Sequence, residues 1–210
     1  MEGKQKTPLI LMLHGFKSNM NDLFALKDFI DPRFTVVSLQ APHMANQNQY
    51  KWYDLMFSSG GNIQSNLPQA SESVELLANF VDAAVDQFQA DEDQVYLLGF
   101  SQGAMMSLYL ALSKPQKIAG AAILSGKAIE GLSNHTSDDS EALSNLSLLV
   151  THGKKDEVIN IDTARSMEKM LKNLSVGLSY KEYDMGHQIS KPCLKDISQW
   201  LKNQIDSKTK

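Results

Sequence analysis

The sequence predicts an α/β fold in which a mostly parallel sheet is wrapped by helices. Short apolar runs alternate with amphipathic stretches from one end of the chain to the other. Most of these apolar runs are continuous, as in strands that are covered on both faces. The length of 210 residues suits one domain better than two, so we expect residues 1–210 to form a single domain.

Six apolar runs are expected to be strands, which would make an open sheet of about six or seven strands. They are residues 9–13, 34–39, 95–98, 119–124, 146–151 and 178–183. Helices are expected between the strands, because apolar residues recur there at helical spacing. One helix carries Val74, Leu77, Val81, Ala84, Val85 and Phe88 on one face, and a C-terminal helix carries Leu194, Ile197, Leu201 and Ile205. Two more helices are expected over residues 22–30 and 161–174.

Two polar segments, residues 41–70 and 126–144, do not have the pattern of a strand or a helix. Both leave the carboxyl end of an expected strand. In open α/β sheets ligands bind beyond those ends, so we expect the two segments to shape an active site.

Composition and charge exclude several classes of function. Twenty Lys and Arg against 24 Asp and Glu give a net charge of −4, which does not suit nucleic acid or anionic lipid as a partner. Cys193 is the single cysteine, so neither an intramolecular disulfide nor a cysteine zinc site is expected. No run approaches the roughly 18 apolar residues of a membrane helix. We expect a cytoplasmic protein without stable membrane insertion, metal or cofactor.

The sharpest chemical signal is the pentapeptide Gly99-Phe-Ser-Gln-Gly103. It follows one expected strand and opens an expected helix over residues 102–112. A G-x-S-x-G sequence in that setting forms a strained turn that exposes the serine hydroxyl above the sheet, and the flanking glycines relieve crowding of the backbone. Ser101 is therefore the predicted nucleophile.

A serine hydroxyl needs a neighbouring base, and the base needs a carboxylate to orient it. On this type of sheet the chain order is serine, acid, histidine. Of the five histidines, only His187 lies after both Ser101 and a plausible acid at a strand end. Asp156 is the favoured acid because it closely follows an expected strand. Glu157 and Asp162 remain alternatives, although Asp162 is placed like a helix N-cap.

Two backbone N–H groups are candidates for stabilising an oxyanion. Gln102 comes directly after the nucleophile at the start of a helix, where N–H groups lack acceptors within the helix. The first strand ends in His14-Gly15, a pair that commonly precedes the second donor, which we assign to Phe16.

These residues together resemble the phospholipase/carboxylesterase family of α/β-hydrolases, which includes the acyl-protein thioesterases. The segments that carry the resemblance are His14-Gly-Phe16, Lys51-Trp-Tyr-Asp54, Gly99-Phe-Ser-Gln-Gly103, Leu124-Ser-Gly126, His152-Gly-Lys-Lys-Asp156 and Gly186-His187. The resemblance implies an α/β-hydrolase fold and a serine esterase or thioesterase. It implies Ser101, Asp156 and His187 as triad, Phe16 and Gln102 as oxyanion donors, and a place near the acyl pocket for Trp52.

The chain departs from the family in two places. Members usually have one or two strands ahead of the His-Gly strand, so we expect a sheet trimmed at its N-terminal edge. They also tend to have His-Gly-x-Gly, where this chain has Lys17. Of the ten methionines, Met56 and Met185 are candidates for lining the acyl pocket, whereas Met105 is expected to fill the core.

We therefore expect a serine carboxylesterase or thioesterase that hydrolyses small to medium acyl esters through an acyl-enzyme intermediate. The triad fixes the chemistry and not the substrate, so a peptidase or lactone hydrolase on the same fold is the alternative enzyme. A catalytically silent hydrolase-like protein that only binds a ligand is the alternative from another class.

Overall fold

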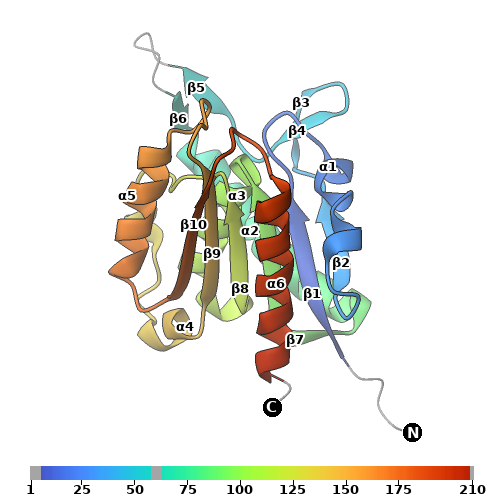
Figure 1. The fold of residues 1–210 in the computed structure, drawn as a ribbon. Helices are drawn as coiled ribbons and strands as arrows, with labels where there is room; N and C mark the ends of the chain where they lie inside the picture. The colour runs from blue at the N-terminus through green and yellow to red at the C-terminus, as the bar shows by residue number, and fades with distance from the viewer. Residues whose placement is uncertain (1–5, 58–62, 209–210) are drawn as a thin grey trace, which may run out of the picture.

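The computed structural model, which describes residues 6–57 and 63–208, has a six-stranded parallel sheet at its centre (Figure 1). The strand order is β10-β9-β8-β7-β1-β2. The strands are β1 (Thr7–Leu13), β2 (Thr35–Leu39), β7 (Ala90–Phe100), β8 (Gly120–Leu124), β9 (Ser147–Gly153) and β10 (Gly177–Tyr183). All six predicted strands are confirmed, and β2 forms the edge on the side where a trimmed sheet is expected.

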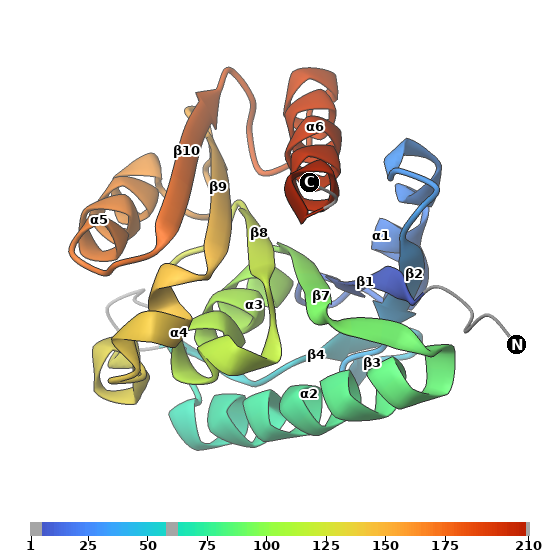
Figure 2. The same cartoon turned by 90° about the horizontal axis from the view of Figure 1, so that it is seen from below.

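Both faces of the sheet are covered, which explains why its strands have continuous apolar runs. Along β1, Leu9, Leu11 and Leu13 belong to one apolar cluster, whereas Ile10 and Met12 belong to another on the opposite face. The first cluster packs beneath helices α2, α3 and α5, and the second beneath α1 and α6 (Figure 2). This is the predicted fold class of a parallel sheet flanked by helices.

The helices are α1 (Met20–Phe24), α2 (Leu67–Phe88), α3 (Gln102–Ser113), α4 (Ser140–Ser144), α5 (Ile161–Lys172) and α6 (Lys191–Lys208). Short 3₁₀ turns lie at Lys27–Phe29, Pro115–Lys117 and Leu132–His135. Among the described residues, no helix is long and apolar enough to cross a membrane.

The prediction that residues 41–70 contain no regular structure is wrong. The segment forms two small hairpins, β3 (His43–Asn46) with β4 (Gln49–Lys51) and β5 (Leu55–Phe57) with β6 (Ile63–Ser65). Strands of three or four residues are too short for an apolar or alternating pattern to stand out, so composition does not reveal them. Residues 58–62 of this segment lie outside the described part of the chain.

Helix boundaries also differ from the predictions. Helix α2 begins inside the segment expected to be irregular, because the Asn66 side chain accepts a hydrogen bond from the Gln69 N–H and Pro68 occupies the first turn. The helix expected over residues 22–30 is divided into α1 and a 3₁₀ turn. Residues 126–144, also expected to be irregular, contain a 3₁₀ turn and α4.

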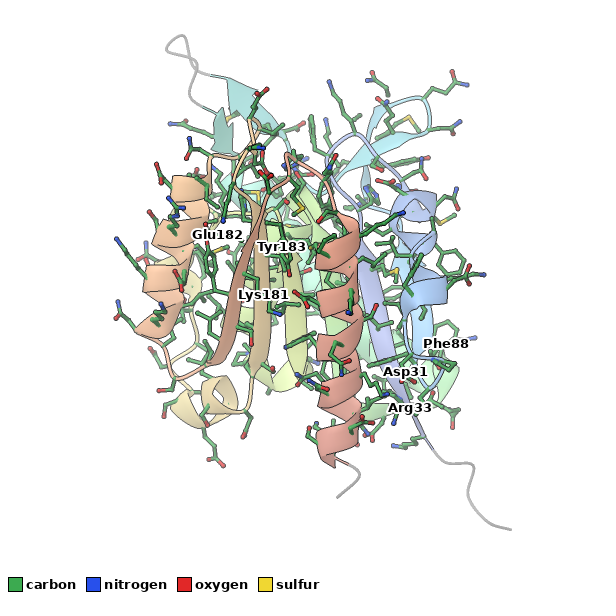
Figure 3. The ribbon with its side chains drawn as sticks, in the orientation of Figure 1. Asp31, Arg33, Phe88, Lys181, Glu182 and Tyr183 are labelled. Atoms are coloured by element: carbon green, nitrogen blue, oxygen red, sulfur yellow. The ribbon has the colours of Figure 1, made fainter. Side chains whose placement is uncertain are left out.

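Strand β10, the other edge of the sheet, is held by polar contacts with the two helices beside it (Figure 3). Glu182 pairs with Arg165 of α5 at 2.8 Å. Lys181 pairs with Asp196 of α6 at 2.9 Å, and the Tyr183 hydroxyl donates to the same carboxylate at 2.7 Å. These contacts fix the end of the strand from which the loop carrying His187 leaves.

Candidate active site

Ser101 lies on the sharp turn between β7 and α3. Its backbone has φ 53° and ψ −116°, in the positive-φ region that residues other than glycine rarely occupy. The Ser101 N–H donates to the Leu124 carbonyl at 2.9 Å, and its carbonyl accepts from the Met105 N–H at 3.1 Å. These two hydrogen bonds tie Ser101 to β8 and to the first turn of α3, and they hold its backbone in the strained conformation.

The glycines on either side of Ser101 are required by close backbone contacts. A Cβ atom on Gly99 would lie 2.3 Å from the Gly103 carbonyl oxygen, and one on Gly103 would lie 2.0 Å from the Leu13 carbonyl oxygen. Both distances are far below van der Waals contact. The absence of two side chains lets α3 start directly against the ends of β7 and β1.

Three side chains from the carboxyl ends of different strands meet above this turn. His187 Nε2 lies 2.9 Å from Ser101 Oγ, and His187 Nδ1 lies 2.7 Å from Asp156 Oδ2. Ser101 follows β7, Asp156 follows β9 and His187 follows β10. If Nδ1 carries the proton, it donates to the carboxylate and Nε2 is free to accept the serine proton.

Asp156 is held in place from the side opposite His187. Its side chain is fully buried, and Oδ1 accepts hydrogen bonds from the N–H groups of Val158 at 2.9 Å and Ile159 at 2.8 Å. Of the alternative acids, Glu157 is exposed and Asp162 pairs with Arg165 in α5. The structure thus brings Asp156, and not these two, to His187.

The loop after β1 passes close to the nucleophile. A Cβ atom on Gly15 would lie 3.4 Å from Ser101 Cβ, and Phe16 lines the same cavity as Ser101. Lys17 adopts φ 58°, the left-handed conformation that usually favours glycine, and the Ser18 N–H closes the turn on the Gly15 carbonyl at 3.3 Å. Lys17 therefore adopts a backbone conformation that glycine reaches at no steric cost.

The oxyanion candidates are positioned by buried polar contacts. Gln102 is the first residue of α3, so its N–H has no acceptor within the helix. Its side chain accepts from the Trp52 N–H at 2.9 Å and donates to the Tyr53 carbonyl at 2.8 Å. The Trp52 indole N–H donates to the His14 carbonyl at 2.9 Å. Trp52 thus holds the end of β1 through its indole N–H, and the Gln102 side chain holds the segment that carries Trp52.

His14 is a fully buried histidine whose ring supports the same loop. Its Nδ1 lies 2.8 Å from the Gly15 carbonyl, and its Nε2 accepts from the Ala41 N–H at 3.1 Å. These contacts suit a neutral ring protonated on Nδ1. Burial lowers the pKa of His14 below its usual value, although the Gly15 carbonyl opposes the shift.

The lowered pKa of His14 predicts that the protein loses stability as the pH falls. Below about pH 6.5 the unfolded chain binds a proton at this position that the folded chain does not bind. The free energy of unfolding should then fall by up to about 1.4 kcal/mol per pH unit until the folded ring also titrates. We expect His14→Gln to have a shallower slope between pH 7 and pH 5 in urea unfolding, since the other four histidines are common to both proteins. Equal slopes would contradict this assignment.

Ser101 and His187 open into a cavity of about 710 Å³. Its walls are Phe16, Leu55, Gln64, Ser65, Ser101, Gln102, Met105, Lys127, Glu130, Val158, Ile159, Asn160, Thr163 and His187. Both polar segments singled out in the sequence contribute to these walls. Lys127 Nζ and Glu130 Oε1 form an ion pair of 2.8 Å there, which lowers the pKa of Glu130 even though partial burial acts to raise it.

The three side chains predicted to bind the acyl group do not line this cavity. Trp52 is 2% exposed and faces the apolar groove between β2 and α2, because its indole is tied to His14. Met185 is buried in the cluster beneath α6, and Met56 is 50% exposed on the β5 hairpin. On strand β5, alternation of side chains places Leu55, the neighbour of Met56, on the cavity side.

Sequence reasoning missed most of the cavity walls. Met105, expected to fill the core, is buried and also lines the cavity from the first turn of α3. Val158, Ile159 and Thr163 follow Asp156 closely in the chain. Their proximity to the predicted acid is the one signal that could have found them, because a turn closed on a carboxylate keeps its next residues near the site.

Comparisons with known proteins agree with this fold. A family model described as Phospholipase/Carboxylesterase matches residues 1–205. A probable carboxylesterase of Oryza sativa subsp. japonica is 27% identical over 93% of this chain and 77% of its own length. The carboxylesterase SOBER1 of Arabidopsis thaliana is 30% identical over 73% of this chain and 68% of its own. The crystal structure of the Bacillus cereus carboxylesterase superposes with a TM-score of 0.81 at 18% identity, covering 95% of this chain and 92% of that one.

Proposed function

This chain belongs to the phospholipase/carboxylesterase family, and from that membership we propose that it hydrolyses carboxylic esters or thioesters with Ser101 as its nucleophile. The observation that carries the proposal is the chain of hydrogen bonds from Ser101 through His187 to the buried Asp156, with distances of 2.9 and 2.7 Å. This arrangement of nucleophile, base and orienting carboxylate is that of a serine hydrolase.

In the acylation step, His187 Nε2 takes the proton of Ser101 as the serine oxygen attacks the substrate carbonyl. Asp156 keeps the other ring nitrogen protonated, and it stabilises the imidazolium that forms. The tetrahedral intermediate collapses when His187 gives its proton to the leaving alcohol or thiol, which leaves an acyl-enzyme. Water then attacks the acyl-enzyme by the same route and restores the free serine.

The N–H groups of Phe16 and Gln102 are proposed to hold the negative oxygen of each tetrahedral intermediate. The Gln102 N–H belongs to the first residue of α3, where the dipole of the helix also favours negative charge. The braced loop after β1 supplies the second donor. Donors that are fixed before the reaction need no reorganisation, and one of them is worth about 3 kcal/mol of transition-state stabilisation.

The cavity supports small to medium acyl groups as substrates. Apolar side chains such as Leu55, Met105 and Ile159 can receive a short chain, whereas the Lys127–Glu130 ion pair occupies part of the wall. A long alkyl chain would have to displace water from these charges without replacing their hydrogen bonds. We therefore expect kcat/KM to increase with acyl chain length only until the chain fills the apolar part of the cavity.

The test is a series of p-nitrophenyl esters with acyl chains of increasing length, measured as kcat/KM. We expect a rise of about fourfold per added methylene while the chain contacts apolar walls, from about 0.8 kcal/mol per buried CH₂, and then a decline. In the double variant Lys127→Met/Glu130→Gln, the ratio of long-chain to short-chain rates should increase. A wild type that is inert on every ester and thioester would contradict the proposed function, and an unchanged ratio would contradict the role of the ion pair.

A further inference from the structure

His152 is a fully buried histidine beside the candidate triad that the reaction outlined above does not use. It lies near the end of β9, four residues before Asp156. Its Nε2 is 2.7 Å from the Ile159 carbonyl oxygen and 3.4 Å from Asp156 Oδ2. Its Nδ1 is buried and, within the described part of the chain, has no hydrogen-bond partner.

These contacts determine which ring nitrogen carries the proton. The Ile159 carbonyl can only accept a hydrogen bond, so Nε2 must donate. The same N–H points close to the Asp156 carboxylate, which is another acceptor. The ring thus presents its Nε2–H to the turn that carries the acid, whereas Nδ1 is buried without a partner among the described residues. A buried nitrogen without a partner is costly, so the favourable polar contact of the ring comes from its other nitrogen.

The turn that His152 contacts connects the acid to the substrate cavity. Asp156 Oδ1 accepts from the Ile159 N–H, and the Ile159 carbonyl accepts from His152. Both backbone polar groups of Ile159 are therefore held by hydrogen bonds, and Ile159 also lines the cavity. Loss of the His152 donor would leave the buried end of the turn free to shift, and with it both Asp156 and the cavity wall.

We propose that His152 is a positioning residue, which acts on the reaction by fixing the turn from Asp156 to Ile159 through its Nε2–H. This inference rests on the proposed function, since it needs Asp156 to orient His187. It goes beyond that function in assigning a role to a second histidine on the same carboxylate.

The test compares His152→Phe, which keeps a ring without a donor, with His152→Gln, whose amide nitrogen can reach the place of Nε2. We expect His152→Phe to lower kcat on a short p-nitrophenyl ester by about 10²-fold, the order of loss that follows from small misplacement of a catalytic group. His152→Gln should recover most of that loss. Thr151→Val, a change at the neighbouring buried position of β9, controls for general loss of packing and should retain kcat.

A double-variant comparison separates positioning from mere loss of stability. In an Asp156→Asn background the orienting carboxylate is already gone, so adding His152→Phe should lower kcat much less than it does in the wild type. An equal loss of kcat in both backgrounds would overturn the proposal, as would a His152→Phe variant with wild-type kcat.

If His152→Phe does not fold, the kcat of His152→Gln is compared with that of the shorter His152→Asn. Only the glutamine reaches Ile159, so equal kcat values for these two variants would also overturn the proposal. An inert wild type would instead refute the proposed function itself.

Discussion

Replacement of Ser101 by alanine is expected to lower kcat on simple esters by about 10⁶-fold, as loss of the nucleophile does in triad enzymes. The alanine has no oxygen with which to form an acyl-enzyme, and His187 then has no proton to accept. Remaining hydrolysis would come from water attacking a substrate held by the oxyanion donors. The Ser101→Ala protein should therefore retain its fold and its affinity for substrate while losing turnover.

Ser125→Ala is the matched control for this variant. Like Ser101, Ser125 has a positive φ, 50°, and it follows the neighbouring strand β8, although its side chain is fully buried. Its hydroxyl has no hydrogen-bond partner among the described residues. We expect kcat of Ser125→Ala to stay close to that of the wild type. If both serine variants lost the same factor, the effect would come from disturbance of the strand ends and not from a missing nucleophile.

Replacement of Gly103 by alanine is expected to lower the free energy of unfolding by more than about 4 kcal/mol, a loss typical of severe packing defects. The added methyl group would overlap the backbone of β1, with the Leu13 carbonyl oxygen at 2.0 Å and the His14 carbonyl oxygen at 2.7 Å. Neither atom belongs to a flexible side chain, so α3 would have to move away from the sheet. Unfolding in urea measures the loss directly.

Gly177→Ala provides the comparison for the Gly103 variant. A Cβ atom at Gly177 would have its nearest neighbour at 3.4 Å, and the residue is exposed at the start of the edge strand β10. We expect this change to alter the free energy of unfolding by less than about 1 kcal/mol. If the two variants lost a similar free energy of unfolding, the close contact between α3 and β1 would not be what makes Gly103 necessary.

The strands were predictable because each is buried on both faces. In β1 and β8 every central position must be apolar whichever side it faces, so the run stands out from its surroundings. The hairpins β3–β4 and β5–β6 carry no such signal. Their strands have only three or four residues, too few for an apolar or alternating pattern to stand out, and pairing between neighbouring strands, which composition does not encode, defines them.

The positions of Ser101, Asp156 and His187 were predictable for a different reason. The turn around Ser101 demands glycines at fixed spacing, and the order of acid and histidine follows from the order of the strands. The cavity walls had no comparable local signal. Whether Trp52 faces substrate or the core depends on its hydrogen bond to the His14 carbonyl, a contact between residues 38 positions apart in the chain.

In the proposed reaction, Ser101 forms a covalent intermediate with the help of His187. The most direct test of this step is to treat the folded protein with a fluorophosphonate, which reacts with activated serines, and to locate the adduct by peptide mass spectrometry. We expect a single adduct on Ser101, slower labelling of His187→Ala and none of Ser101→Ala. An adduct on another residue, or equal labelling of the wild type and Ser101→Ala, would contradict the account.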